Sequence, residues 1–273
     1  MSVAISLLRA SHPEPAAGVT AVAVLLSLGL DRPVPGVIAA GATVLASQLS
    51  IGWVNDALDA ERDAAAGRTD KPVAAGKVSR RLVAALGAAA AVVCVPLGFL
   101  SGWQAGLVSA LALASALLYD WPLKATAVSV LPYAVSFACL PAFVVLGAGK
   151  TPPVWLLAAG ALLGAGAHFV NTLPDLDADV RTGIRGLPQR FGRRGSLVAA
   201  AVLLLGATAA LALGPPGPPA VLFWPALALA LIALFWGWYR MNRDTTSRAP
   251  FLAVIAVALI DVVFLLISGL NLD

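Results

Sequence analysis

Apolar stretches of about 17–22 residues recur along the whole chain, and each is long enough to cross the hydrocarbon core of a bilayer as a helix. The stretches are continuous runs of Ala, Leu and Val, whereas the strands of a transmembrane β-barrel would alternate apolar and polar residues. Of all residues, 60% are hydrophobic and 12% are charged, against about 25% charged in soluble domains. The sequence therefore predicts an all-α, polytopic membrane protein with one domain over residues 1–273.

We predict nine transmembrane spans. The connections after spans one, three, five and seven are short and rich in Gly or Pro, whereas those after spans two, six and eight are longer and basic. The predicted spans are residues 16–30, 36–55, 79–100, 104–120, 128–147, 154–172, 195–213, 219–239 and 250–269.

The distribution of Lys and Arg favours one orientation in the membrane. If the N-terminus is cytoplasmic, 16 of the 18 basic residues fall in cytoplasmic segments, and Arg32 and Lys150 face outwards. Basic residues accumulate on the cytoplasmic side, so we predict a cytoplasmic N-terminus, cytoplasmic loops after the even-numbered spans and an outside C-terminus. The net charge of +4 then follows from topology and does not indicate a nucleic-acid partner. The first fifteen residues lack a signal-peptide cleavage pattern, so we expect them to be retained.

Two segments, residues 55–78 and 171–194, share six residues at the same spacing. A constant offset of 116 positions indicates an internal repeat. Four predicted spans separate the copies, so both lie on the same face of the membrane and can converge on one site. The pairs are Asn55/Asn171, Asp59/Asp175, Asp63/Asp179, Gly67/Gly183, Pro72/Pro188 and Gly76/Gly192.

The Asn and the two Asp residues of each copy stand at positions i, i+4 and i+8, which share one face of an α-helix. They lie at the C-terminal ends of spans two and six, where the helix dipole disfavours negative charge. A cation would offset this charge, and oxygen ligands without nearby His or Cys favour Mg²⁺. Asp56 and Asp177 add further acidity outside the repeat.

Basic residues accompany these carboxylates. Mg²⁺ in proteins is commonly shared between a few carboxylates and the phosphate oxygens of a substrate. Carboxylates and cations together at a membrane surface are therefore typical of a diphosphate site, although each basic residue could also serve only topology and headgroup contact. The candidate diphosphate-binding residues are Arg68, Lys71, Lys124, Arg181 and Arg185.

The first segment, Asn55-Asp56-x-x-Asp59-x-x-x-Asp63, resembles the NDxxDxxxD signature of the UbiA superfamily of intramembrane prenyltransferases. Asp175-x-x-x-Asp179 is similar to the second acidic loop of that family. The chain departs from the family pattern at Lys71, where an Arg is common, and at Ala125, which replaces the second residue of a Lys-Arg pair after Lys124.

The resemblance implies a Mg²⁺-dependent enzyme. Two Mg²⁺ ions and the basic residues would bind an isoprenyl diphosphate and stabilise its leaving group, and the allylic carbocation would be captured by an aromatic or lipid acceptor in the membrane. The carboxylates at 59, 63, 175 and 179 would be essential to catalysis, and no residue is assigned to accept the final proton. The implied metal ligands are Asn55, Asp59, Asp63, Asp175 and Asp179.

Two other functions stay open. A membrane terpene cyclase of the same superfamily would use the same diphosphate site without an acceptor. A cation transporter would use the carboxylates as ion ligands, but it would carry acids near mid-span and inverted repeats, whereas this repeat is parallel.

A few polar residues fall outside these motifs. His168 is expected to pack between helices, with proton acceptance as the alternative, and His12 is either exposed or an acceptor contact. Asp261 lies inside the last span and is expected to pair with an interior donor or to line a cavity. Cys94 and Cys139 are expected to be buried apolar-like side chains.

Overall fold

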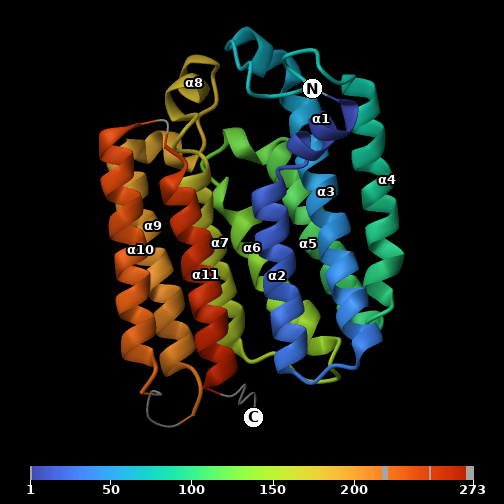
Figure 1. Cartoon of the computed structure of the whole chain (residues 1–273), viewed down its shortest axis with the longest axis vertical. Coiled ribbons are helices and arrows are strands. Elements are labelled where there is room, and N and C mark those ends of the chain that lie inside the picture. The colour runs from blue at the N-terminus through green and yellow to red at the C-terminus, as the bar shows by residue number, and fades with distance from the viewer. Residues whose placement is uncertain (1, 217–220, 246, 269–273) are drawn as a thin grey trace.

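The computed structural model describes residues 2–216, 221–245 and 247–268, and the described residues form a helical bundle without a strand (Figure 1). The long helices run side by side, and the short helices α1 and α8 lie at the same end of the bundle. In chain order the helices are α1 (Val3–Ala10), α2 (Pro13–Gly29), α3 (Val34–Ala65), α4 (Arg80–Phe99), α5 (Trp103–Asp120), the 3-10 turn η1 (Leu123–Ala125), α6 (Val130–Leu146), α7 (Val154–Asn171), α8 (Leu176–Arg181), α9 (Leu187–Leu213), α10 (Phe223–Arg243) and α11 (Ala249–Ile267).

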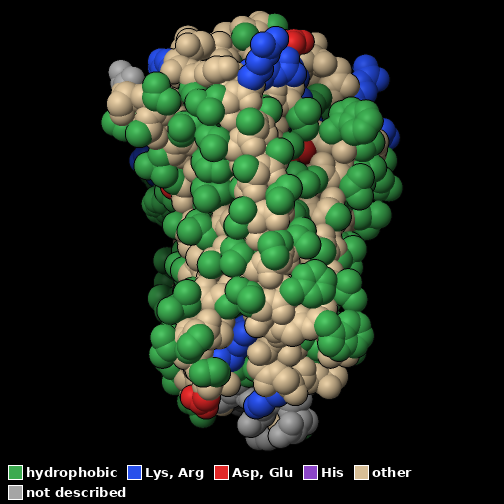
Figure 2. All heavy atoms as spheres, turned by 90° about the vertical axis from the view of Figure 1, so that its right-hand side faces the viewer, with side chains coloured by type: hydrophobic (Ala, Val, Ile, Leu, Met, Phe, Trp, Pro, Cys, Tyr) green, Lys and Arg blue, Asp and Glu red, His purple; other side chains and the backbone are tan. Residues whose placement is uncertain are grey.

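Each of the nine predicted spans overlaps a helix of the described chain. Six of these helices (α3, α4, α7, α9, α10 and α11) are long and apolar enough to cross a membrane by length and composition. Positions 219, 220 and 269, at the ends of the last two predicted spans, lie outside the described residues. Figure 2 shows hydrophobic side chains over the middle of the α4 face and charged side chains towards its two ends, as a bilayer requires.

The two copies of the repeat share their backbone conformation. The helix of the first copy ends at Ala65 and that of the second at Arg181, which is again a step of 116 positions. After each end a backbone N–H reaches back five residues: Arg68 N donates to Asp63 O, and Ile184 N to Asp179 O, both at 2.9 Å. Such a bond is typical of a helix that closes with a left-handed residue.

Glycines supply that left-handed residue in both copies. Gly67 has φ +73° and Gly183 φ +87°, and the second pair, Gly76 and Gly192, has φ +68° at both positions. A side chain in this region clashes with its own backbone. The repeated glycines are therefore a consequence of the repeated turn, and Gly192 also breaks α9 into two helical pieces.

The second copy differs from the expectation in one respect. Asn171, Asp175 and Asp179 were predicted to share one helix face, but α7 ends at Asn171 and α8 starts at Leu176. Pro174 lies in the break, where it has no N–H to donate to the helix and disfavours helical backbone in the preceding residue. In the first copy no proline intervenes, so α3 carries Asn55, Asp59 and Asp63 continuously.

Small residues let neighbouring helices approach closely. A Cβ on Gly160 of α7 would lie 2.5 Å from Phe137 O of α6, and a Cβ on Gly52 of α3 would lie 2.5 Å from Ser11 O. Close approach at glycine is a common device of membrane helix packing. The contact at Gly52 holds the junction between α1 and α2 against α3.

Candidate active site

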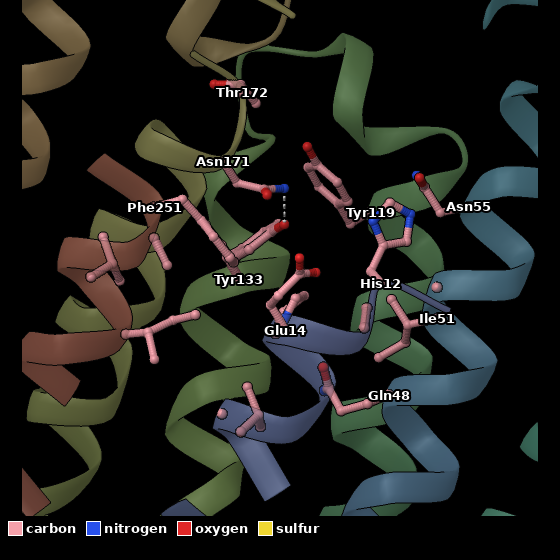
Figure 3. A pocket seen from close by; sticks show the side chains of 18 of the residues that line it. His12, Glu14, Gln48, Ile51, Asn55, Tyr119, Tyr133, Asn171, Thr172 and Phe251 are labelled. Carbon is pink, nitrogen blue, oxygen red and sulfur yellow. Dashed lines mark hydrogen bonds between the residues drawn. The ribbon is translucent and has the colours of Figure 1, made fainter. Parts of the chain in front are cut away.

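A cavity of about 1020 Å³ opens between the acidic segments and continues into the bundle. Its deeper wall is apolar and comes from α2, α6, α7, α9 and α11, with residues such as Val22, Leu140, Leu163, Leu211 and Val262. Figure 3 shows polar side chains, among them His12, Asn55, Tyr119 and Asn171, around the upper part of this cavity. The cavity thus combines a charged entrance with an apolar interior.

The two copies of the repeat meet at the entrance. All five implied metal ligands, Asn55, Asp59, Asp63, Asp175 and Asp179, line this one cavity. Arg68, from the turn after the first motif, forms an ion pair with Asp175 of the second. The predicted convergence of the two acidic segments is therefore present in the structure.

Most of the carboxylates here are paired with cations of the chain. Arg62 Nη2 lies 2.6 Å from Asp59 Oδ2, and Lys124 Nζ pairs with the other oxygen of Asp59. Lys71 Nζ lies 3.7 Å from Asp63 Oδ2. Asp59 and Asp63 are both buried, with 7% of each residue exposed. Buried carboxylates need compensating positive charge, and the lysines and arginines supply it here.

The chemistry of these side chains fits Mg²⁺. The candidate ligands are all oxygen donors, which is the set that Mg²⁺ prefers. In the described residues no three His, Cys, Asp or Glu side chains converge as a ready ligand set. A cation would therefore have to replace Lys124 at Asp59 and Arg68 at Asp175, which are both long side chains with several rotatable bonds.

The predicted diphosphate-binding residues divide into three groups. Arg68, Lys124 and Arg181 line the cavity. Lys71 also lines it, but its Nζ lies 2.7 Å from the buried Asp56 Oδ1. Arg185 is exposed, does not line the cavity and uses its carbonyl to accept a bond from Arg190 Nε at 3.0 Å.

Ion pairs and burial change the acidity of several groups in the loops. Arg68 donates to both oxygens of Asp70, at 2.9 and 2.8 Å. These bonds lower the pKa of Asp70 to about 2 and raise the pKa of Arg68. Burial raises the pKa of Asp179 to about 6, although Gln189 Nε2 donates to Asp179 Oδ2 at 3.0 Å. Burial alone would lower the pKa of Lys71, but the Asp56 carboxylate raises it above its ordinary value.

Two neighbours orient the asparagines of the repeat, and neither was among the predicted site residues. Asn55 Nδ2 donates to Asp120 Oδ1 at 3.0 Å, and Asn171 Nδ2 donates to the Tyr133 hydroxyl oxygen at 2.9 Å. With its nitrogen engaged, each amide keeps its oxygen for a cation. Asp120 stands four residues before Lys124, a predicted site residue, and this position could have indicated its contact with Asn55. Tyr133 carried no signal, because it stands inside an apolar run.

The two histidines have different environments. His168 is 1% exposed, does not line the cavity, and its Nε2 lies 3.0 Å from Ser129 Oγ. This confirms the prediction that it packs between helices. His12 lines the cavity at the N-terminus of α2, and its Nε2 lies 3.0 Å from Asp56 Oδ1.

The remaining polar and sulfur-containing residues lie deeper in the bundle. Asp261 is buried, accepts a hydrogen bond from Thr208 Oγ1 at 3.2 Å and lines the deeper part of the cavity. Both alternatives predicted for Asp261 therefore hold. Cys94 and Cys139 are free and buried, as predicted.

Known proteins resemble this chain over most of its length. A model of the UbiA prenyltransferase family matches residues 16–264. The chain is 30% identical over 184 residues to the digeranylgeranylglyceryl phosphate synthase of Methanopyrus kandleri, a match that covers 66% of each chain. It is 28% identical over 254 residues to the synthase of the same name from Natronomonas pharaonis, with 90% of each chain covered.

Among solved structures, a UbiA homolog from Archaeoglobus fulgidus bound to GPP and Mg²⁺ matches with a TM-score of 0.72. The sequence identity is 15%, and the match covers 98% of this chain and 99% of that chain. At this identity the likeness establishes a shared fold.

Proposed function

This chain belongs to the UbiA prenyltransferase family, and from that premise we propose that it transfers an isoprenyl group from an isoprenyl diphosphate to a lipid acceptor within the membrane, in a Mg²⁺-dependent reaction. The observation that carries the proposal is the convergence of the two acidic segments, joined by the Arg68–Asp175 ion pair, over one apolar cavity. The names of the two relatives support a prenyl donor and a glyceryl lipid.

The carboxylates and amides of the repeat are the proposed metal ligands. Asn55, Asp59 and Asp63 would hold one Mg²⁺, and Asp175 and Asp179 a second. Bound there, Mg²⁺ would neutralise the diphosphate and lower the energy of the departing pyrophosphate. When the ligands turn to the metal, Lys124 loses Asp59 and Arg68 loses Asp175, so both cations become available to the phosphate oxygens.

The donor chain would lie in the deeper cavity. Arg181 adds a cation at the entrance, and we propose that Lys71 contributes positive charge from its place against Asp56. Preorganised cations stabilise the charge that develops on the leaving group as the allylic C–O bond breaks. The apolar wall keeps water from the carbocation, so the acceptor captures it in preference to water. For Arg185, which lies outside the cavity, we propose at most a peripheral role in attracting the anionic donor.

The experiment uses the purified protein in lipid nanodiscs with geranylgeranyl diphosphate, Mg²⁺ and geranylgeranylglyceryl phosphate. Formation of a diprenylated lipid and release of diphosphate, both lost on chelation of Mg²⁺, are the expected results. A cyclic hydrocarbon or alcohol from donor alone would instead identify a terpene cyclase. If no diphosphate is released from prenyl donors of about 10–20 carbons, the proposed reaction is wrong, since ionisation of the donor is its first step.

A further inference from the structure

We propose that His12, held by Asp56, is the general base that takes the proton from the acceptor hydroxyl. The inference rests on the proposed transfer reaction and adds to it the residue that completes the proton balance. The two side chains are a histidine at the cavity wall and, behind it, a buried aspartate of the first acidic segment that is not one of the six repeated residues.

The contact between the two residues fixes the tautomer of the imidazole. Asp56 is 2% exposed, and its Oδ1 receives Lys71 Nζ at 2.7 Å as well as His12 Nε2 at 3.0 Å. A carboxylate that is paired with an ammonium group can only accept hydrogen bonds. The proton of the neutral imidazole therefore sits on Nε2, and Nδ1 carries the free lone pair.

The ring is placed to use that lone pair. The His12 side chain is 33% exposed and lines the cavity. In Figure 3 the ring lies beside Asn55 and Tyr119, with one nitrogen turned towards α3 and the other towards the interior of the pocket. Asn55 and Asp56 are consecutive in α3, so the base lies next to the proposed metal ligands and hence near the diphosphate end of the donor.

The backbone is strained to hold this position. His12 has φ +54° and ψ +68°, a left-handed conformation that is uncommon for any residue other than glycine. It is maintained by the close approach of Ser11 O to Gly52, which lies one helical turn before Asp56 on the same face of α3. Strained residues that the fold over-determines concentrate at functional sites.

Other proton acceptors at the cavity are less suited. Glu14 is already engaged in an ion pair with Arg248 Nη1 at 3.1 Å. Asp120 is 2% exposed and accepts the Asn55 amide, and His168 does not line the cavity. Among the described residues, His12 combines an imidazole nitrogen outside the Asp56 contact with access to the cavity.

The bond from donor C1 to the diphosphate oxygen breaks, and its electron pair leaves with the diphosphate. The acceptor hydroxyl oxygen bonds to C1 while its proton moves to His12 Nδ1. The resulting imidazolium, stabilised by Asp56, then returns the proton to the solvent. His12 acts on the acceptor alone, so ionisation of the donor does not require it.

Two rates measured on the same nanodisc sample test the inference. One is lipid ether formation from geranylgeranyl diphosphate with geranylgeranylglyceryl phosphate. The other is the slower Mg²⁺-dependent diphosphate release without acceptor, in which water captures the carbocation and the prenyl alcohol forms. For His12→Gln, which can still donate to Asp56, ether formation should fall about 100-fold or more. Acceptor-free release should stay within about threefold of wild type, because donor ionisation precedes the proton transfer. The retained release also demonstrates that the variant is folded.

His12→Gly is the rescue variant, because glycine adopts the left-handed backbone without strain and leaves room for a small base. Added imidazole should restore ether formation in this variant. Asp56→Asn should lower ether formation more than acceptor-free release, because the tautomer of His12 is no longer fixed. His168→Gln is the matched control and should leave the ratio of the two rates unchanged.

Three results would overturn the inference: near wild-type ether formation by His12→Gln, an equal fall of both rates, or no recovery of His12→Gly with imidazole. Measurements on the wild-type protein distinguish failure of the His12 inference from failure of the proposed function. Absence of both diphosphate release and ether in the wild type would refute the transfer reaction itself.

Discussion

Arg68 and Asp175 form an ion pair that joins the two acidic segments, although 107 positions separate them in the chain. The arginine comes from the turn after α3 and the aspartate from the break between α7 and α8. Arg68 also binds both oxygens of Asp70. One guanidinium thus compensates a carboxylate from each copy of the repeat, and a divalent cation at Asp175 must displace it.

The first prediction concerns Asp175 and its neighbour Asp177. Asp175→Asn should lower turnover at least about 100-fold, because loss of a metal ligand costs more than loss of an outer contact. Asp177→Asn is the control, since Asp177 does not line the cavity and its carboxylate pairs with Arg193 at 3.1 Å. Steady-state diphosphate release measures both, and equal activities would remove Asp175 from the metal site.

The second prediction compares Arg181, which lines the cavity, with Arg185, which does not. Arg181→Ala should raise the KM for the prenyl diphosphate about 10-fold, the usual effect of losing one charged hydrogen bond. Arg185→Ala should change that KM less than threefold, because an exposed charge outside the cavity is screened by solvent. A larger effect at Arg185 than at Arg181 would contradict the position of the diphosphate proposed here.

The third prediction follows from the raised pKa of Asp179, about 6, which burial causes. Below that pH the carboxyl group binds a proton and is neutral, and a neutral carboxyl is a poor metal ligand. The Mg²⁺ concentration that gives half-maximal activity should therefore rise as the pH falls through 6. A Mg²⁺ titration at each pH measures this, and the step should be absent in Asp179→Asn if that variant retains measurable activity. The titration covers pH 7 to pH 5, about one unit either side of that pKa. A half-maximal Mg²⁺ concentration that stays constant over this range would refute the prediction.

The fourth prediction concerns the repeated glycines. Gly183→Ala should destabilise the fold by about 1–2 kcal/mol, because alanine at φ +87° is strained although the space around it is open. Gly206→Ala is the matched control: it lies inside α9, where the new methyl group would meet Leu162 at 3.6 Å, an ordinary contact. Thermal unfolding in detergent should show a lower Tm for Gly183→Ala alone. Indistinguishable melting of the two variants would argue against a conformational role for the repeated glycine.

The sequence predicted the positions of the helices well. Bilayer thickness sets the length of an apolar run, so each run shows where a helix lies in the chain. It also predicted the equivalence of the two segments, which the matching turns at Gly67 and Gly183 bear out. It did not predict the break at Pro174. The helical spacing of Asn171, Asp175 and Asp179 indicated a continuous helix, although a proline lies between the first two. The orientation in the membrane and the count of nine crossings stay predictions.

By itself, then, the sequence determined the class of fold, the two acidic segments and the kind of chemistry that oxygen ligands and cations can perform. Only the tertiary structure decided which charges meet: Arg68 with Asp175, Lys124 with Asp59, and His12 with Asp56. These pairs join segments that are far apart in the chain, and their contacts depend on how the helices pack. Local patterns encode helix length and turn geometry, whereas the partner of a buried charge is fixed by the helix packed against it.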